Sequence, residues 1–588
     1  MQKIWRPRTA WGTGQAPDNL DVSSDLLRHL LALRGLSDQA AAARFLAPDY
    51  ERDILDPFLM LDMKRAGERI IRAVRDGERL AIFADYDADG VPGAVVLASF
   101  FRQIGFDNFS VYIPDRHDES YGLNVQALAS LAAAGVKLVI TVDCGITDVA
   151  AVKEANRLGL EVIITDHHLV PETLPPAYAI INPKRLNDQY PYKMLCGAGV
   201  AFKLVQGLVQ FLWKSDIHGS WISDFHQVKP GWEKWLLDLV AIATVSDLAP
   251  LTGENRVLVH FGLKVLRRTP RLGLRALFRG LKLTPEFITE DDIGFLIGPR
   301  LNSASRMSHG DEAYALLTAE DEVEADRLAR HLEEKNQERR ARVVAILGAA
   351  RVEVSGNESV IVIGNSTWSL GVLGLAASRL VEEFRRPVFL WGRNGRGEIK
   401  GSCRSDGTVN IVELMKLAHS QADDLFLNYG GHAQAGGFSL RRERLPELVE
   451  HLSAAYLALE KLPTSNGDLF YDRELPIDDV TSETHSLLER LAPFGPENHK
   501  PIFLLSGLTI ISSRAFGSDQ SHLEMVFLHP DFGQLRAVQF FALPLAITKG
   551  ESLPMARTHL DILATLEKSY FRARPELRLR IVDWREAL

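Results

Sequence analysis

The chain has 588 residues, 46% of them hydrophobic and 24% charged, and a formal net charge of −9. This length exceeds what one hydrophobic core supports, so we expect three or four domains in an otherwise ordinary globular protein. The acidic balance excludes a chain that is basic over its whole surface, so any binding of nucleic acid must come from local basic patches.

The three cysteines lie far apart, at positions 144, 196 and 403. This spacing excludes a CxxC zinc site and a disulfide framework, and it favours a reducing compartment. The N-terminus lacks the apolar core of a signal peptide, and acidic residues interrupt the apolar stretch 235–251, so we expect no membrane span. Together these features predict a cytoplasmic protein.

The first 55 residues carry a helical pattern. From Leu80 to about Ile181, short apolar runs alternate with helical segments, which is typical of βαβ units and a parallel sheet. Mainly helical sequence then follows to about Leu317. We therefore expect an N-terminal helical segment, residues 1–55, and an α/β domain, residues 56–319.

Three of these apolar runs end in acidic residues or histidines. Residues 81–84 lead into Asp85, Asp87 and Asp89, residues 138–142 into Asp143, and residues 162–165 into Asp166, His167 and His168. Open α/β sheets place their sites at the carboxyl ends of the strands, so these side chains should meet at one sheet edge. Oxygen ligands with one or two imidazoles suit Mn²⁺ or Mg²⁺ better than a thiolate-preferring metal.

Residues 85–90 have further features of a metal site. Acids spaced by two residues at an extended strand tip would face the same side, and Gly90 would allow a sharp turn into the next helix. Such carboxylates repel one another unless cations neutralise them. Asp247, which also ends an apolar run, is a further candidate ligand.

Each acid alone has a simpler explanation, because a single Asp after a strand is usually a helix cap or a turn residue. We expect that role for Asp148. Three strand-end clusters within one domain argue against coincidence, and the sequence therefore favours a metal centre.

The remaining chain predicts three more regions. Residues 320–354 are charged and free of Pro, which favours a long solvated helix that bridges two domains. A second α/β pattern covers residues 355–460, and the Pro-, Ser- and Gly-containing segment after it is an expected linker. About five short β-type runs between residues 501 and 584 predict a small barrel within residues 465–588.

The second α/β domain contains basic and small polar groups, among them Lys400, Ser402, Arg404 and His432, beside several glycines. Glycines allow the backbone to approach a phosphate closely. By composition alone, a phosphate role is as well supported as ordinary turns with a surface ion pair.

One connecting loop in the expected barrel interleaves basic and aromatic residues: Lys568, Tyr570, Phe571, Arg572 and Arg574. This composition suits binding of a single strand by stacking and charge. A solvated hairpin loop with its aromatics in the core explains Tyr570 and Phe571 almost as well.

Taken together, the motifs resemble a known family. The segments 85–90 (DYDADG), 142–145 (VDCG), 166–168 (DHH) and 243–247 (ATVSD), in this order, resemble the DHH phosphoesterase superfamily. Residues 400–405 and 430–437 resemble the second domain associated with many of its members. With segments 114–123 and 298–302 and the tail barrel, the chain is most similar to the single-strand-specific DNA exonucleases of that superfamily.

The resemblance implies a DHH domain, a DHH-associated domain joined to it by the long helix, and a C-terminal OB-fold. It implies a 5′-to-3′ exonuclease that releases 5′-mononucleotides from single-stranded DNA in repair and recombination, beside a helicase and a single-stranded-DNA-binding protein. We expect a monomer that hydrolyses the phosphodiester with two divalent cations, Mn²⁺ or Mg²⁺.

The resemblance also implies residue roles at the metal centre. One cation would be held by Asp87 and Asp143, with Asp85 nearby. The other would be held by Asp89, His167 and Asp247, with Asp143 bridging the two cations. His168 would face the phosphate.

For the DNA strand, the resemblance implies that its 5′ end is held by Arg116, Arg306, Ser402 and Arg404, with Asn302 in support and His432 facing the cleft. The chain departs from the family pattern at two places. Residues 91–94 (VPGA) lack the usual Thr and Ser, and Ser305 replaces a glycine beside Arg306.

Two alternatives stay open. The first is another DHH enzyme, such as a pyrophosphatase or a phosphodiesterase for oligonucleotides or cyclic dinucleotides, although such enzymes generally lack the barrel and the long helix. The second is a non-catalytic scaffold that binds single strands. Such relatives lose metal ligands, whereas this chain has all the expected acids.

Overall fold

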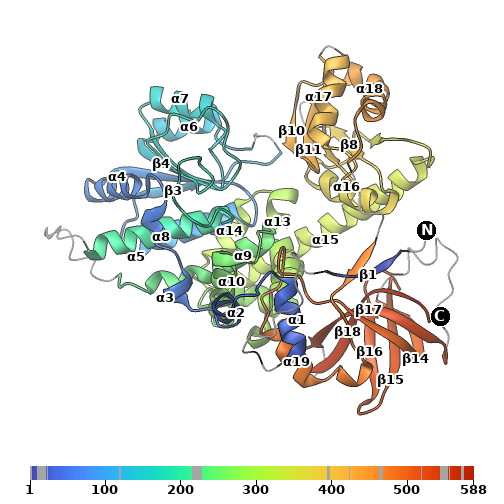
Figure 1. Ribbon diagram of the computed structural model, residues 1–588. Coiled ribbons are helices and arrows are strands. Elements are labelled where there is room, and N and C mark those ends of the chain that lie inside the picture. Colours follow the sequence, from blue (N-terminus) through green and yellow to red (C-terminus); the bar gives the residue numbers. More distant parts are fainter. Residues whose placement is uncertain are drawn as a thin grey trace. The chain divides into compact units, whose positions relative to one another are not determined.

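The computed structural model describes residues 3–9, 22, 24–117, 119, 121–214, 228–393, 397–422, 424–462, 468–517, 520–542, 554, 556–570 and 575–587. Two compact units are present. One comprises residues 55–249 and 261–464, and the other comprises residues 1–54, 250–260 and 465–588. We call them the catalytic unit and the barrel unit and describe each by itself (Figure 1).

A five-stranded parallel sheet organises the first half of the catalytic unit. Its strands are β2 (Arg79–Ala84), β3 (Phe109–Tyr112), β4 (Val136–Val142), β5 (Glu161–Thr165) and β6 (Ala179–Ile181), in the order β3-β2-β4-β5-β6. Every neighbouring pair is parallel. The central strands are buried along almost their whole length, as expected when helices cover both faces. The predicted α/β fold with a parallel sheet is confirmed.

Helices cover the two faces of this sheet (Figure 1). Helices α6 (Val125–Ala133) and α7 (Val149–Arg157) pack on one face, while α4 (Met63–Arg75), α5 (Gly90–Gln103) and α8 (Gly197–Lys214) lie on the other. The helical segment after them contains α9 (Leu237–Ser246), α10 (Gly253–Leu266), α11 (Leu272–Leu281), α12 (Glu290–Asp292), the π-helical turn η6 (Ile293–Ile297), α13 (Gly298–Met307) and α14 (Asp311–Leu317). Within the described ranges, no helix has the length and hydropathy needed to cross a bilayer.

The long charged segment forms one helix, α15 (Glu322–Glu353). Asp321 caps it by accepting a hydrogen bond from the backbone N–H of Glu324. Its first half packs on α11 and α13, and its second half packs on α16 (Leu370–Phe384), so it lies against both α/β halves of the unit. The helix is therefore less solvated than its sequence suggests.

The second half of the catalytic unit is a mixed five-stranded sheet. Its strands are β7 (Ile361–Gly364), β8 (Val388–Arg393), β9 (Ile399–Arg404), β10 (Asn428–His432) and β11 (Ala435–Leu440), in the order β10-β11-β9-β8-β7. Only β7 and β8 pair in parallel. Helices α15 and α16 pack on one face, and α17 (Ile411–Gln421) and α18 (Leu445–Ala458) pack on the other.

The barrel unit contains a closed five-stranded barrel, which confirms the predicted OB-fold. Its strands are β14 (Phe503–Phe516), β15 (His522–His529), β16 (Gly533–Gln539), β17 (His559–Ser569) and β18 (Glu576–Glu586). They follow the order β14-β15-β16-β18-β17, and β17 pairs back with β14. The short strand β13 (Arg473–Glu474) and helix α19 (Ser482–Glu489) precede the barrel.

The N-terminal residues fold with this barrel, which the sequence did not lead us to expect. Strand β1 (Trp5–Pro7) pairs in parallel with β12 (Leu469–Tyr471), and α1 (Asp25–Leu33) places Leu27 and Leu30 in the apolar core of the barrel unit. Helices α2 (Gln39–Leu46) and α3 (Tyr50–Asp53) belong to the same unit. The buried guanidinium of Arg256 donates hydrogen bonds to carbonyls of residues 45 and 491 and so links these distant segments.

Candidate metal centre

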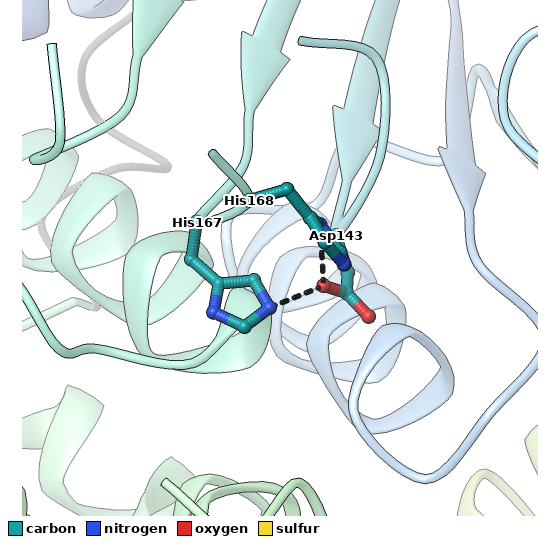
Figure 2. A group of neighbouring side chains, drawn as sticks. All are labelled: Asp143, His167 and His168. Atoms are coloured by element: carbon teal, nitrogen blue, oxygen red, sulfur yellow. Dashed lines mark ion pairs between the residues drawn. The ribbon is translucent and has the colours of Figure 1, made fainter. Parts of the chain in front are cut away.

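The acidic residues found in the sequence converge at the carboxyl edge of the parallel sheet. Asp85 follows β2, Asp143 follows β4, and the segment 166–168 follows β5. Because β2, β4 and β5 are adjacent in the sheet, their carboxyl ends lie side by side. Figure 2 shows Asp143 with the two histidines that the next strand contributes.

Three groups of side chains bring their ligand atoms within 4.8 Å of one another. They are Asp85, Asp87 and Asp143; Asp89, His167 and Asp247; and Asp143, His167 and His168. The third group shares members with the first two, so the groups form two adjacent candidate sites with Asp143 between them. These are the residues that the sequence selected.

His167 lies at the centre of this arrangement. Its Nε2 atom lies 3.1 Å from an oxygen of Asp143, 3.7 Å from one of Asp89 and 3.9 Å from one of Asp247. Burial, together with the neighbouring His168, lowers the pKa of His167 to about 3. The imidazole is therefore neutral at physiological pH, which is the form that ligates a metal.

The backbone of residues 85–89 differs from the sequence-based expectation. We predicted an extended strand tip, but β2 ends at Ala84 and the chain turns at once. Asp87 Oδ1 accepts hydrogen bonds from the N–H groups of Asp89 and Gly90, at 2.8 and 3.1 Å. This turn directs Asp87 and Asp89 to different, adjacent ligand groups, and the prediction of an extended strand tip was wrong.

Two glycines let this turn pack tightly. A Cβ atom at Gly90 would lie 2.4 Å from the carbonyl oxygen of Asp85, so no larger residue fits there. A Cβ at Gly197 would lie 2.4 Å from the Cβ of Asp143. Gly90 is thus required because the sharp turn brings the Asp85 carbonyl close to it, and not for a positive φ.

The start of α8 fixes the orientation of Asp89. Its two carboxylate oxygens accept hydrogen bonds from the backbone N–H groups of Gly197 and Ala198, at 2.6 and 2.7 Å. A helix N-terminus stabilises negative charge, so α8 favours the ionised form of this acid. Desolvation and the nearby Asp87 outweigh this effect and raise the pKa of Asp89 to about 6.

The donor set fits hard divalent cations. Burial raises the pKa of Asp85 and of Asp143 well above its usual range, and burial and Asp89 raise the pKa of Asp247 to about 9. Asp85 Oδ1 and Asp143 Oδ1 are buried and have no hydrogen-bond partner among the described residues. Buried carboxylate oxygens of this kind require a partner, and Mn²⁺ or Mg²⁺ would supply one.

Asp166 has a different place from the other acids. Its Oδ1 accepts hydrogen bonds from the backbone N–H groups of His167 and His168 and pairs with the His168 ring at 2.8 Å. Its Oδ2 accepts one from the N–H of Ile146. These bonds occupy both oxygens, so Asp166 orients the histidine pair.

Tyr121 also contacts the centre, and the sequence gave us no role for it. Its hydroxyl donates to the backbone carbonyl of Asp143 at 2.9 Å and lies 3.2 Å from His168 Nδ1. Asp143 has a φ of 61°, a left-handed conformation that is costly outside glycine. Tyr121 therefore helps to hold Asp143 in this conformation.

The structure corrects the role predicted for Asp148. This residue occupies the N-cap position of α7, but its carboxylate makes no capping bond to the helix. It accepts instead from the N–H of Leu123 at 2.7 Å, which joins the loop after Gly122 to α7.

Three arginines predicted to hold the strand end lie in the same unit. Arg116 lies over the ring of Tyr86, Arg306 donates to the carbonyl of Gly371 at 3.1 Å, and Arg404 donates to the carbonyl of residue 403. No carboxylate lies within ion-pair distance of them in the described ranges. Burial and the nearby Arg116 lower the pKa of Arg306 to about 9. We call Arg116, Arg306 and Arg404 the arginine group.

The other residues predicted to contact the DNA strand differ in how close they lie to the arginine group and to the metal centre. Ser402 and Arg404 both lie next to Gly374. A Cβ atom at Gly374 would lie 3.7 Å from the Ser402 hydroxyl and 2.8 Å from the Arg404 guanidinium. Asn302 accepts from the backbone N–H of Ala88 at 3.0 Å and so supports the turn between the metal-centre acids. His432 is exposed at the end of β10, and none of its described contacts reaches the metal centre.

On the barrel, Lys568 and Tyr570 lie at and just after the end of β17, whereas Phe571, Arg572 and Arg574 fall outside the described residues.

The barrel also has a second group of aromatic residues that the sequence analysis did not identify. Phe516, His522, Phe540 and Phe541 have ring centroids 4.7–6.2 Å apart. Arg578 and Arg580 lie over Phe540 at 5.9 and 5.4 Å. We call this set the barrel aromatic group.

The signal that could have revealed this group was weak. Phe540 and Phe541 end an apolar run, and the sequence therefore assigned them to a strand. They lie beyond the end of β16 instead, where 37% and 61% of their surface is exposed. Exposed aromatics beside arginines are suited to stacking on nucleic-acid bases.

Comparison with protein-family models finds three matches. Residues 79–244 match the N-terminal domain of the DHH family, residues 357–457 match the DHHA1 domain, and residues 471–583 match the RecJ OB domain. The order of the three matches is the order of the two sheets and the barrel along the chain.

Two curated relatives cover most of the chain. The single-stranded-DNA-specific exonuclease RecJ of Haemophilus influenzae is 31% identical over 91% of this chain and 92% of that protein. RecJ of Bacillus subtilis is 37% identical over 90% of this chain, which spans 65% of the length of that relative.

Solved structures agree with the sequence matches. RecJ of Thermus thermophilus in complex with Mn²⁺ superposes with a TM-score of 0.77 at 28% identity, covering 96% of this chain and 76% of the other. The same protein in complex with Mg²⁺ gives a TM-score of 0.73 at 26% identity, covering 100% and 79%.

Proposed function

The chain belongs to the RecJ family of single-stranded-DNA-specific exonucleases, and we propose that it hydrolyses single-stranded DNA from the 5′ end, releasing 5′-mononucleotides. One observation carries this proposal: two adjacent groups of candidate metal ligands meet where Asp143 lies 3.1 Å from His167 at a sheet edge, and the same unit holds the arginine group without carboxylate partners in the described ranges.

We propose that Asp85, Asp87 and Asp143 hold one cation and that Asp89, His167 and Asp247 hold the other. When bound, two divalent cations would activate water and stabilise the charge that develops during phosphodiester hydrolysis. The protein fixes their ligands in advance: α8 orients Asp89, and Tyr121 holds the backbone of Asp143.

His168 is proposed to face the scissile phosphate. Its ring pairs with Asp166, which is buried and hydrogen-bonded through both oxygens, so the imidazole has a fixed orientation. Desolvation lowers the pKa of His168, but the Asp166 carboxylate more than offsets this and raises it overall. A cationic imidazole here would attract phosphate oxygens.

The arginine group and Ser402 are proposed to bind the 5′-terminal phosphate. Guanidinium groups suit phosphates because their N–H donors form a planar fork. A fixed pocket for the chain end sets the distance to the cut bond, which would explain why an enzyme removes single nucleotides. The barrel aromatic group and Lys568 are proposed to hold the strand by stacking and charge.

We further propose that the protein acts in the cytoplasm as a monomer, in DNA repair and recombination, beside a helicase and a single-stranded-DNA-binding protein. The wide spacing of the three cysteines supports the reducing compartment in this proposal.

The experiment that tests the function is digestion of end-labelled strands by the purified protein with Mn²⁺ or Mg²⁺. We expect mononucleotides from 5′-phosphorylated single strands, an intact duplex and no reaction in a chelator. If pyrophosphate or cyclic dinucleotides are hydrolysed while long single strands stay intact, the chain is another kind of DHH phosphoesterase. Binding of single strands without cleavage in either metal would indicate a scaffold.

A further inference from the structure

A cavity of about 160 Å³ lies beside the metal centre, in the catalytic unit. Its lining residues are Ser246, Gly294, Gly298, Pro299, Asn302, Arg306, Arg339 and Leu375. They come from the end of α9, from η6 and α13, from the long helix α15 and from α16. The volume is well above the roughly 10–15 Å³ that one water molecule needs.

Two guanidinium groups line this cavity without an acidic partner in the described part of the chain. Arg306 donates to the carbonyl of Gly371, and Arg339 donates to the side-chain oxygen of Asn336 at 2.9 Å. Both acceptors are neutral, and within the described ranges no carboxylate pairs with either arginine. Two like charges held together in a partly buried place are costly unless an anion joins them.

The remaining polar groups also suit an anion. The Ser246 hydroxyl is buried and has no hydrogen-bond partner among the described residues, and it lies on the cavity wall. Gly298 keeps the space open, because a Cβ there would lie 2.4 Å from that hydroxyl. Ser246 precedes Asp247, and Asn302 bonds to Ala88, so the cavity adjoins residues next to candidate metal ligands.

We propose that this cavity binds a phosphate group and that Arg339, on the long helix, is one of its ligands together with Arg306 and Ser246. The proposal rests on the proposed function and deepens it, since the phosphate would belong to the DNA strand. The connecting helix then contacts the substrate directly. A phosphate at the 5′ terminus and one inside the strand share this chemistry.

The test compares full-length wild-type protein with Arg339→Ala and Arg339→Gln. Arg342→Ala is the control, because Arg342 lies on the same helix and pairs with Glu338 at its surface. The measurements are kcat and KM on 5′-phosphorylated and 5′-hydroxyl single strands, the inhibition constant for inorganic phosphate, and the thermal midpoint.

We expect both Arg339 variants to raise KM and the phosphate inhibition constant by roughly tenfold or more, the usual effect of losing a charged hydrogen bond. The thermal midpoints of both Arg339 variants should equal that of the wild-type protein. All measured values of Arg342→Ala should also equal those of the wild type. A loss confined to the 5′-phosphorylated strand would assign the cavity to the terminal phosphate, and an equal loss on both strands would assign it to an internal one.

The proposal is overturned if Arg339→Ala and Arg339→Gln match Arg342→Ala in KM and in phosphate inhibition. It is also overturned if the glutamine variant, which keeps a donor toward Asn336, changes the thermal midpoint but not KM. Failure of the proposed function is distinguishable, because wild-type protein would then not digest single strands at all.

Discussion

The catalytic unit holds two clusters of charged side chains, one acidic and one basic. At the sheet edge, Asp85 Oδ1 and Asp143 Oδ1 are buried without a hydrogen bond from the described residues, and Asp143 Oδ1 lies 3.1 Å from the neutral ring of His167. Arg306, Arg404 and Arg339 donate to neutral acceptors, and Arg116 lies over the ring of Tyr86. The described residues form no ion pair between the two clusters, which is why we propose that cations complete the first and phosphates the second.

Among the variants, Asp143→Ala should have the largest effect on the cleavage rate. Asp143 is a member of the group with Asp85 and Asp87, and its carboxylate lies 3.1 Å from His167 of the other site, so Asp143→Ala should disturb both sites. We expect the cleavage rate to fall at least about 100-fold, because even outer partners of metal ligands typically cost 10–100-fold. Single-strand binding, measured by fluorescence anisotropy, should survive.

The control is Glu154→Ala, since Glu154 is an acid that pairs with Arg157 on the same helix. An unchanged cleavage rate in Asp143→Ala would remove this residue from the metal centre. Loss of binding and cleavage together would indicate a folding defect.

In the basic cluster, Arg404→Ala should weaken recognition of the 5′ end of the DNA strand and leave the affinity for metal unchanged. We expect a drop of roughly 10–100-fold in kcat/KM on 5′-phosphorylated strands, the range for a lost charged hydrogen bond. The loss on 5′-blocked strands and the Mn²⁺ concentration for half activity should change little. Equal losses on both strands would argue against end recognition.

The barrel aromatic group should affect binding of the strand and leave the chemical step unchanged, because it lies in another unit than the metal centre and the arginine group. Phe540→Ala and Phe541→Ala should each weaken single-strand binding by about 1–3 kcal/mol, the usual contribution of one stacked base. Exposed Phe532→Ala, on the same barrel, is the control. Binding equal to that control would place the strand elsewhere on the barrel.

The stability of the metal-free protein is a further test of the acidic cluster. In the folded protein, burial and neighbouring acids raise the pKa of Asp89 to about 6 and of Asp247 to about 9, against about 3.9 in an unfolded chain. Because the pKa of each acid is higher in the folded protein than in the unfolded chain, the protonated acids stabilise the fold at pH 4. This stabilisation is lost as the pH rises through the folded pKa values of about 6 and about 9.

The thermal midpoint of metal-free protein should therefore fall increasingly below that of Mn²⁺-loaded protein between pH 5 and pH 9. Asp247→Asn should flatten this dependence. A gap between the two midpoints that does not change with pH would contradict the assignment of buried, uncompensated acids.

Much of the fold and of the site could be predicted from the chain. The apolar runs that end at residues 84, 142 and 165 are buried parallel strands, and their short length and their alternation with helical segments identify them. Their carboxyl ends meet because adjacent parallel strands share an edge, so Asp143 and His167 could be placed together without a structure.

Other features depend on contacts that sequence does not encode locally. Tyr121 reaches Asp143 through a loop, and Arg339 looks like any charged residue of a solvated helix. The turn at residues 85–90 depends on the hydrogen bonds of Asp87 and on the close approach of Gly90. None of these has a period or a motif of its own.

The pairing of β1 with β12 has a consequence for how the chain is made. Some 460 residues separate Pro7 from Leu469, and Leu27 and Leu30 enter a core completed by strands that come still later. At the usual speed of synthesis, this interval lasts roughly 20–90 s. Residues 5–7 and helix α1 thus leave the ribosome long before their partners and are among the last to fold, and the catalytic unit can form in this interval.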